Sequence, residues 1–200
     1  MRRIVVVNHI TLDGVMQAPA APDEDSRGGF EYGGWATPYG DQVMGDKMAQ
    51  NMVGGPGDLL FGRRTYEHMA AVWPHMPADN PYTEVINASR KYVASTTLSD
   101  PLDWNNSTVL EGEAGHAVAK LKAEPGNDIV VLGSGQLVQT LMARDLVDEY
   151  LLTIHPLVLG SGRKLFPDGS PYTALDLVDV TPTTTGVLIA TYRPSERRPG

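Results

Sequence analysis

Three polar or glycine-rich segments each follow a short apolar run, and the residue types in all three could bind an anion. The first is Gly62-Arg63-Arg64-Thr65, which comes directly after Asp58–Phe61 and opens a helical segment. Thr65 can cap that helix, and exposed backbone amides beside two guanidinium groups favour a phosphate group. The same residues also suit a capped helix with two solvated arginines, so this segment alone leaves both interpretations open.

The second segment is Gly133-Ser134-Gly135-Gln136, which lies between the apolar run Asp128–Leu132 and a helix with one apolar face. Glycine lets a ligand approach the backbone closely, and the start of a helix supplies free N–H donors. The spacing does not fit the dinucleotide fingerprint G-x-G-x-x-G, because its last glycine would fall on Val138. By itself the segment is also an ordinary strand–helix turn.

The third segment is Ser95-Thr96-Thr97, which follows the apolar run Lys91–Ala94. Its hydroxyl groups could bind phosphate or simply cap the turn. In a parallel sheet the carboxyl ends of the strands share one edge, which is where ligands bind. Three phosphate-suited strand ends at that edge together predict a nucleotide site.

Alternating apolar runs and helical patterns must position these segments. Such alternation indicates an α/β fold with a mostly parallel sheet covered on both sides, and the last 50 residues, which lack a helix, predict antiparallel strands at one edge. The expected strands are 4–7, 58–61, 91–94, 107–110, 128–132, 150–155, 175–180 and 186–192, and the expected helices are 38–52, 66–72, 114–123 and 136–144.

Two long stretches show no regular pattern, and loops of such length are often functional lids. Gln17–Trp35 contains four glycines and the acidic residues at 23–25, and Pro74–Ser89 is the second stretch. We expect the first to close over the site with Phe30, Tyr32 and Trp35 as apolar anchors, or else to be an ordinary surface excursion. With little to pack on, it should be mobile without ligand.

Composition limits the remaining function classes. The 200 residues include 16 Lys and Arg against 24 Asp and Glu, a net charge of −8, and no cysteine. An acidic chain without a basic run is a poor candidate for binding nucleic acid or an anionic membrane. Disulfides and thiolate chemistry are excluded. The five histidines are scattered without the spacing of metal ligands, which argues against a metal site, and His155 is expected to be structural. No signal peptide or membrane span is evident, so we expect a soluble, cytoplasmic protein with one domain over 1–193 and a frayed tail over 194–200.

Five longer motifs occur in order along the chain. They are N-H-I-T-L-D-G-V-M-Q (8–17), G-G-W (33–35), G-R-R-T-Y-E (62–67), V-L-G-S-G-Q-L-V-Q-T-L (131–141) and D-E-Y-L-L-T-I-H-P-L-V-L-G-S-G-R-K-L-F (148–166). Over about residues 2–193 the chain resembles the dihydrofolate-reductase-like family. The branch it resembles is the reductase (C-terminal) domain of the bacterial riboflavin-pathway deaminase–reductase. No single motif is specific, whereas the ordered set is.

The resemblance implies a three-layer α/β/α fold with a mostly parallel eight-stranded sheet. It also implies NADPH-dependent reduction of a pteridine-like or aminopyrimidine ring, as in 5-amino-6-(5-phosphoribosylamino)uracil reductase, by a protein that is often a homodimer. The implied cofactor contacts, carried over residue by residue, are Thr11, Gly14, Gly62, Arg63, Arg64, Thr65, Ser95, Thr96, Thr97, Gly133, Ser134, Gly135, Gln136 and Leu137.

The chain departs from the family pattern in two respects. A zinc deaminase domain is often fused to such reductases, and none fits into 200 residues without cysteine. A substrate-binding acid is expected on the helix before G-R-x-T, where spacing to Gly62 favours Asp46 and helical geometry favours Asp41.

Asp13 is a further candidate for a polar substrate contact, with a plain turn residue as the competing interpretation. The alternative function is a non-catalytic NADP-binding or sensor protein on the same scaffold.

Overall fold

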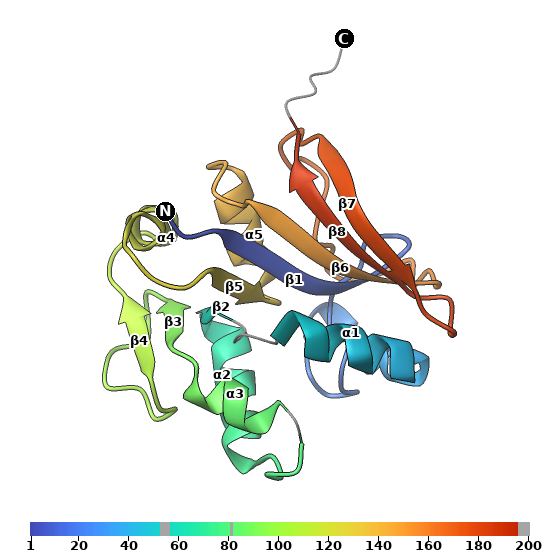
Figure 1. Cartoon of the computed structure of the whole chain (residues 1–200), viewed down its shortest axis with the longest axis horizontal. Helices are drawn as coiled ribbons and strands as arrows, with labels where there is room; N and C mark the ends of the chain where they lie inside the picture. The colour runs from blue at the N-terminus through green and yellow to red at the C-terminus, as the bar shows by residue number, and fades with distance from the viewer. Residues whose placement is uncertain (53–56, 81, 196–200) are drawn as a thin grey trace.

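One eight-stranded sheet forms the centre of the molecule in the computed structural model, which describes residues 1–52, 57–80 and 82–195 (Figure 1). The strand order is β4-β3-β2-β5-β1-β6-β8-β7, in which β8 runs antiparallel to β6 and β7 antiparallel to β8, while all other pairs are parallel. The strands are β1 (Ile4–Thr11), β2 (Asp58–Gly62), β3 (Lys91–Ala94), β4 (Ser107–Leu110), β5 (Ile129–Leu132), β6 (Glu149–His155), β7 (Leu175–Pro182) and β8 (Leu188–Pro194).

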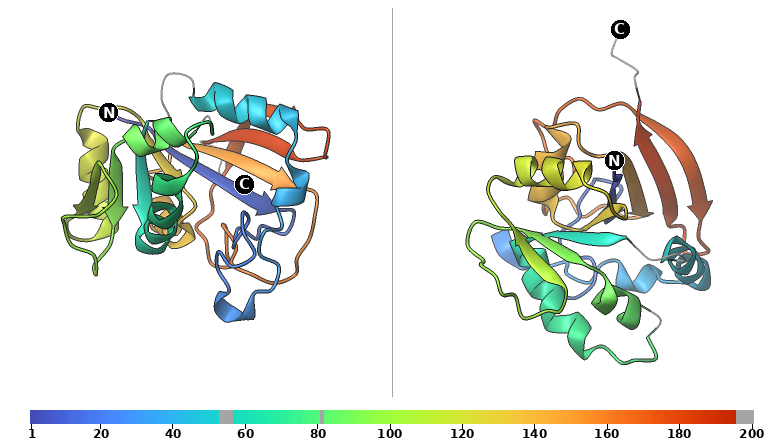
Figure 2. Two further views of the ribbon diagram at one scale, coloured as in Figure 1. Left: turned by 90° about the horizontal axis from the view of Figure 1, so that it is seen from below. Right: turned by 60° about the vertical axis from the view of Figure 1, so that its left-hand side comes forward.

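Helices cover both faces of this sheet, which gives three layers (Figure 2). On one face, α4 and α5 pack on the main apolar cluster; on the other, α2 and α3 cover the β2–β3 side and α1 covers β6 and β8. The helices are α1 (Gln42–Met52), α2 (Arg63–Val72), α3 (Thr83–Ala88), α4 (Ala114–Ala123) and α5 (Gly135–Met142), with short 3-10 turns η1 (Arg27–Gly29), η2 (Thr37–Tyr39) and η3 (Trp73–His75). The predicted three-layer, mostly parallel fold with antiparallel C-terminal strands is confirmed.

Alternation along β1 shows how the two faces differ. Ile4, Val6 and Asn8 are buried on the side of α4 and α5, whereas Val5, Val7 and His9 are only half-buried. The half-buried side lies where α1 and α2 stand apart, so part of this sheet face has no helix over it.

Three predictions of local structure need correction. Thr65 does not cap α2, because the helix begins at Arg63 after Gly62 and no side chain caps it. The helix expected from Thr37-Pro38 is a 3-10 turn there, and α1 begins only at Gln42, because Asp41 Oδ1 accepts the Met44 amide at 2.8 Å and caps the helix. In addition, the stretch 74–89 is not irregular, since it contains η3 and α3.

The 17–35 segment is packed rather than bare. Phe30 and Trp35 are each 7% exposed and form a small apolar cluster, and Trp35 Nε1 donates to Gln17 O at 2.7 Å. The Gln17 side chain in turn donates to two carbonyl groups of the same segment. Two of the predicted anchors are therefore buried by contacts within the protein. Tyr32 is half exposed, and the expectation that the segment has little to pack on is wrong.

The C-terminal end departs slightly from the expected boundary. Pro194 closes β8, and the Ser195 amide donates to Ala174 O at 2.8 Å, so the regular structure continues past residue 193. The rest of the predicted frayed tail, residues 196–200, lies outside the described residues.

Candidate active site

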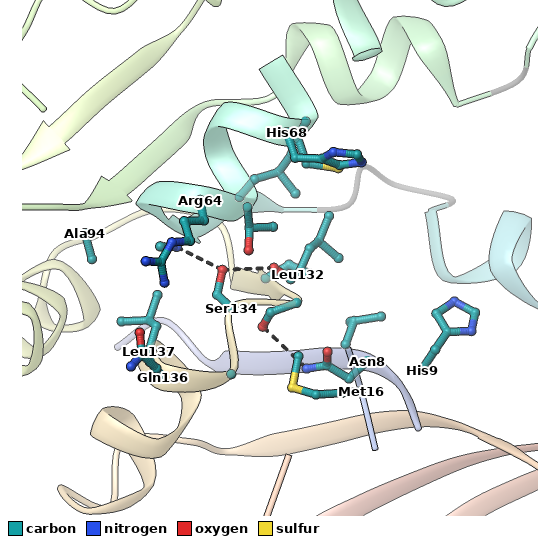
Figure 3. Close-up of a pocket in the computed structure, with 18 of the residues that line it drawn as sticks. Asn8, His9, Met16, Arg64, His68, Ala94, Leu132, Ser134, Gln136 and Leu137 are labelled. Carbon is teal, nitrogen blue, oxygen red and sulfur yellow. Dashed lines mark hydrogen bonds between the residues drawn. The ribbon is translucent and has the colours of Figure 1, made fainter. Parts of the chain in front are cut away.

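A cleft of about 2470 Å³ occupies the part of the sheet face that α1 and α2 leave uncovered (Figure 3). A site for a drug-sized ligand is typically about 300–1,000 Å³, so this cleft is larger than a single such ligand needs. Its floor consists of half-buried side chains from the three central strands, and its walls include Met48 of α1 and Met69 of α2. The floor residues are Val5, Val7, His9, Val130, Leu132, Leu151 and the more deeply buried Thr153.

At one end of the cleft the N-termini of α2 and α5 meet. The Ser134 hydroxyl joins them, because its Oγ accepts the Gly62 amide at 2.9 Å and donates to Leu132 O at 3.3 Å. Gly133 and Ser134 both have left-handed backbone conformations, with φ of 58° and 60°. A Cβ on Gly133 would lie 3.4 Å from a Thr65 methyl group, so the two turns approach closely.

Neither helix start is capped by a side chain, so the first-turn amides of both helices are available to a ligand. Two N-terminal helix dipoles at one place favour a negative charge. This end of the cleft can therefore hold a phosphate group.

The two arginines of α2 differ in their surroundings. Arg63 forms an ion pair with Glu67 one helical turn later, with an Nη1–Oε1 distance of 3.0 Å. Arg64 forms no ion pair or hydrogen bond with any described residue, and Figure 3 shows its guanidinium directed towards Gln136 and the Ser134 turn. Arg64 is thus the cation at this end that is free to bind a ligand.

The third predicted segment borders the same cleft. Ser95 Oγ is already used inside the turn, since it accepts the amides of Thr97 and Leu98 at 3.1 and 3.0 Å. Thr96 is exposed, so its hydroxyl remains available to a ligand.

The structure brings most of the predicted cofactor-contacting residues together. Those that line the cleft are Gly62, Arg63, Arg64, Thr65, Ser95, Thr96, Thr97, Gly133, Ser134, Gly135, Gln136 and Leu137. Thr11 and Gly14 do not line it. Thr11 is buried and its Oγ1 accepts the Val15 amide at 3.0 Å, which makes it part of a tight turn with Gly14 at φ 82°.

The three predicted acids also lie away from the cleft lining. Asp13 belongs to the same turn, where its carboxylate accepts the amides of Gly160 at 2.8 Å and Leu159 at 3.3 Å. Burial raises the pKa of Asp13, but hydrogen bonds from Thr11, Gly160 and Leu159 outweigh it and leave the pKa below its usual value. Asp13 is therefore an ionised turn residue.

Asp41 and Asp46 serve α1 itself. Asp41 caps the helix and accepts from both the amide and the hydroxyl of Thr184, and these bonds lower its pKa, the hydroxyl bond most. Asp46 accepts the Gln42 side-chain amide at 3.0 Å on the exposed side of the helix. Neither carboxylate is in a position to contact a ligand in the cleft.

Sequence reasoning did not single out the residues of the cleft floor, among which His9 carries a polar ring. Its Nδ1 lies 3.0 Å from Nε2 of His155, which is fully buried. Burial lowers the pKa of both imidazoles to about 4, so both are neutral near pH 7. The sequence does contain a pattern that places His9 there, because His9 continues the alternation of Val5 and Val7 on β1 and so lies on the same face of the sheet.

Two further properties concern the described part of the chain. None of its helices is both long and apolar enough to cross a bilayer. Among the same residues, no group of His, Asp and Glu side chains is arranged to hold a metal ion.

Comparisons with known proteins agree with this architecture. Two Bacillus subtilis (strain 168) proteins of uncharacterised function are similar in sequence. YyaP is 30% identical over 199 residues, covering 96% of this chain and 94% of its own. YwjB is 32% identical over 119 residues, covering 60% and 63%.

Two solved structures share the fold. A protein named for riboflavin biosynthesis from Shewanella sp. PV-4 gives a TM-score of 0.63 at 20% identity, covering 97% of this chain and 99% of that one. A pyrimidine reductase-like protein from Corynebacterium diphtheriae gives 0.64 at 14% identity, covering 98% and 93%. The family model for the RibD C-terminal domain matches residues 2–189, nearly the whole chain. This chain therefore belongs to the RibD C-terminal domain family.

Proposed function

We propose that this protein is an NADPH-dependent reductase that delivers a hydride to a pteridine-like or aminopyrimidine heterocycle. The observation that carries the proposal is one continuous cleft with an anion-binding end at α2 and α5 and a weakly polar floor over β1 and β6. Membership of the RibD C-terminal domain family supports a reductase, and a similar structure is named as pyrimidine reductase-like.

The residues at the α2–α5 end fit a dinucleotide cofactor. NADPH, when bound, supplies the hydride, which side chains of the protein cannot provide. The uncapped helix starts and Arg64 would hold its phosphate groups, with the exposed Thr96 hydroxyl beside them. An additional phosphate, which distinguishes NADPH from NADH, is the group that a free guanidinium recognises best.

The floor over β1 and β6 suits the uncharged heterocycle. Val5, Val7 and Leu151 offer apolar surface, while His9 and Thr153 add polar groups without charge. The hydride would add to the carbon of a C=N or C=O bond, and the heteroatom would take a proton from water. Excluding bulk water from this floor would strengthen each polar contact with the ring.

Exposed apolar residues on the edge strand support the expectation of a homodimer. Leu177, Val178 and Val180 of β7 are 54%, 49% and 42% exposed. A partner strand that covered this edge would bury them and satisfy its free backbone groups.

One observation favours the alternative of a non-catalytic NADP-binding or sensor protein. All three predicted acids are engaged elsewhere, so none of them can donate a proton to a substrate in the cleft. The alternative requires only the α2–α5 end of the cleft.

Titration and turnover distinguish the two functions. NADPH and NADH are titrated into the protein, and nicotinamide absorbance is then followed with a panel of pteridines and ribityl-aminopyrimidines. Preferred binding of NADPH together with oxidation in the presence of a panel compound supports the reductase. Tight NADPH binding without turnover of any compound supports the alternative, and absence of NADPH binding contradicts both.

A further inference from the structure

The His9–His155 pair lies at the part of the cleft away from the anion-binding end. The two strands that carry it are neighbours in parallel register, with His9 opposite Thr153 and Thr11 opposite His155. Figure 3 shows the His9 ring projecting from β1 well apart from Arg64 and Gln136. The cleft therefore has a cationic end and, separate from it, a neutral imidazole.

His155 is enclosed by aromatic side chains, and none of the described residues forms a hydrogen bond with its Nδ1. Its ring meets Trp35 and Tyr39 edge to face, with centroids 5.1 and 5.5 Å away. Its Nδ1 is buried and has no hydrogen-bond partner among the described residues. An enclosed imidazole of this kind is neutral, and it must carry its single proton on one nitrogen or the other.

The position of that proton follows from the cost of the two arrangements. A proton on Nδ1 would leave a buried N–H donor without an acceptor, which is rarer and costlier than an unpaired acceptor nitrogen. A proton on Nε2 is instead donated to His9 at 3.0 Å. His155 thus donates and His9 Nδ1 accepts.

The direction of this hydrogen bond determines which nitrogen of His9 carries a proton. Because its Nδ1 accepts, a neutral His9 must carry its proton on Nε2. Nε2 has no partner within the described residues, and His9 lines the cleft. The pair therefore presents one N–H donor to whatever occupies this part of the floor.

We propose that His9 Nε2–H donates a hydrogen bond to a ring carbonyl oxygen or ring nitrogen of the bound heterocycle, and that His155 is the positioning residue that fixes this tautomer. This assignment rests on the proposed function for the identity of the heterocycle. It selects neutral or anionic rings with an acceptor at that position and disfavours cationic rings. A donor held at this acceptor would also draw electron density from the carbon that receives the hydride.

The tautomer is tested by long-range proton–nitrogen NMR on the histidine rings of the full-length protein. The wild type should show His9 with a protonated Nε2. His155→Phe keeps a ring against Trp35 and Tyr39 but has no donor, so His9 should become a mixture of tautomers. His155→Gln can still donate and should restore the Nε2–H form. A wild-type His9 protonated on Nδ1 would overturn the assignment.

Ligand binding is tested with lumazine, a pteridine with two ring carbonyl groups, by its fluorescence in the presence of NADP⁺. His9→Phe should weaken lumazine about three- to tenfold, the loss of one neutral hydrogen bond, while NADPH affinity stays unchanged. His9→Gln, which keeps a donor, is the matched control and should lose less. Equal lumazine affinity in wild type and His9→Phe, or no saturable binding to the wild type, would overturn the ligand assignment.

The readouts also separate this inference from the proposed function. Absence of NADPH binding with an intact Nε2–H tautomer and lumazine site would refute the reductase and leave the His9 assignment standing. Normal NADPH turnover in a protein whose His9 is protonated on Nδ1 would support the reductase and refute the His9 assignment.

Discussion

Replacing Arg64 by Gln should weaken NADPH binding, while the same change at Arg63 should have little effect. The two residues are adjacent on α2 and identical in type, but only Arg63 is paired within the protein, with Glu67 at 3.0 Å. Arg64 keeps all of its donors for a ligand. The pair of variants therefore separates a specific phosphate contact from a general loss of positive charge, because both lower the net charge equally.

The magnitude follows from the type of bond. A hydrogen bond to a charged group contributes about 1.5–3 kcal/mol, and each 1.4 kcal/mol changes affinity about tenfold. Arg64 is exposed, so screening by solvent and salt places the loss near the lower end, about tenfold. The exposed Arg63–Glu67 pair contributes at most about 1 kcal/mol, and it contributes this to folding rather than to ligand binding, so Arg63→Gln should lower NADPH affinity less than Arg64→Gln does.

The assay is calorimetric titration of NADPH and NADH into the wild type and both variants at low and high salt. Arg64→Gln should reduce NADPH affinity and its salt dependence, and it should affect NADH less if Arg64 meets the additional phosphate. Equal losses in the two variants would refute the distinction between them. Unchanged NADPH affinity in Arg64→Gln would show that the cofactor phosphates bind elsewhere.

Three further predictions concern the turn, the loop and pH. Gly135→Val should reduce NADPH affinity more than thermal stability, because a Cβ there would lie 2.8 Å from a flexible methionine sulfur and crowd the helix start; normal NADPH binding would contradict this. The Gly34 amide donates to Ala18 O at 2.8 Å within the 17–35 segment, so it should be protected from hydrogen exchange in the ligand-free protein. Rapid exchange of this amide would instead identify the segment as a mobile lid. His9 and His155 have folded pKa values of about 4 against 6.5 for a free imidazole, so the unfolded chain binds more protons between these values and stability should fall as pH drops from about 6.5 to 4. Between pH 6.5 and 4 the denaturant midpoint should change less steeply with pH in His155→Gln than in the wild type. An equally steep change in the variant would mean that other groups cause the loss of stability.

Local patterns in the sequence determined most of the elements. Lys91–Ala94, Ser107–Leu110 and Ala114–Ala123 are predicted with the observed bounds, because apolar periodicity and a following proline or polar turn mark them within a few residues. The α2–α5 end could also be predicted, since parallel strands place their carboxyl ends at one edge. The ion pair between Arg63 and Glu67 could be predicted as well, because the two residues are four positions apart in a helix.

Contacts between distant segments decided the rest. Asp41 caps α1 through the Met44 amide and is also bound by Thr184, far along the chain, and a helical wheel contains no such distant partner. His9 and His155 are 146 positions apart in sequence, and only the register of β1 against β6 brings their nitrogens to 3.0 Å. Composition and periodicity report what one segment favours by itself, whereas the protonation site of an imidazole depends on which groups enclose it. The sequence by itself therefore determined the sheet and its phosphate-suited edge, and the tertiary structure decided which side chains reach the cleft and in what chemical form.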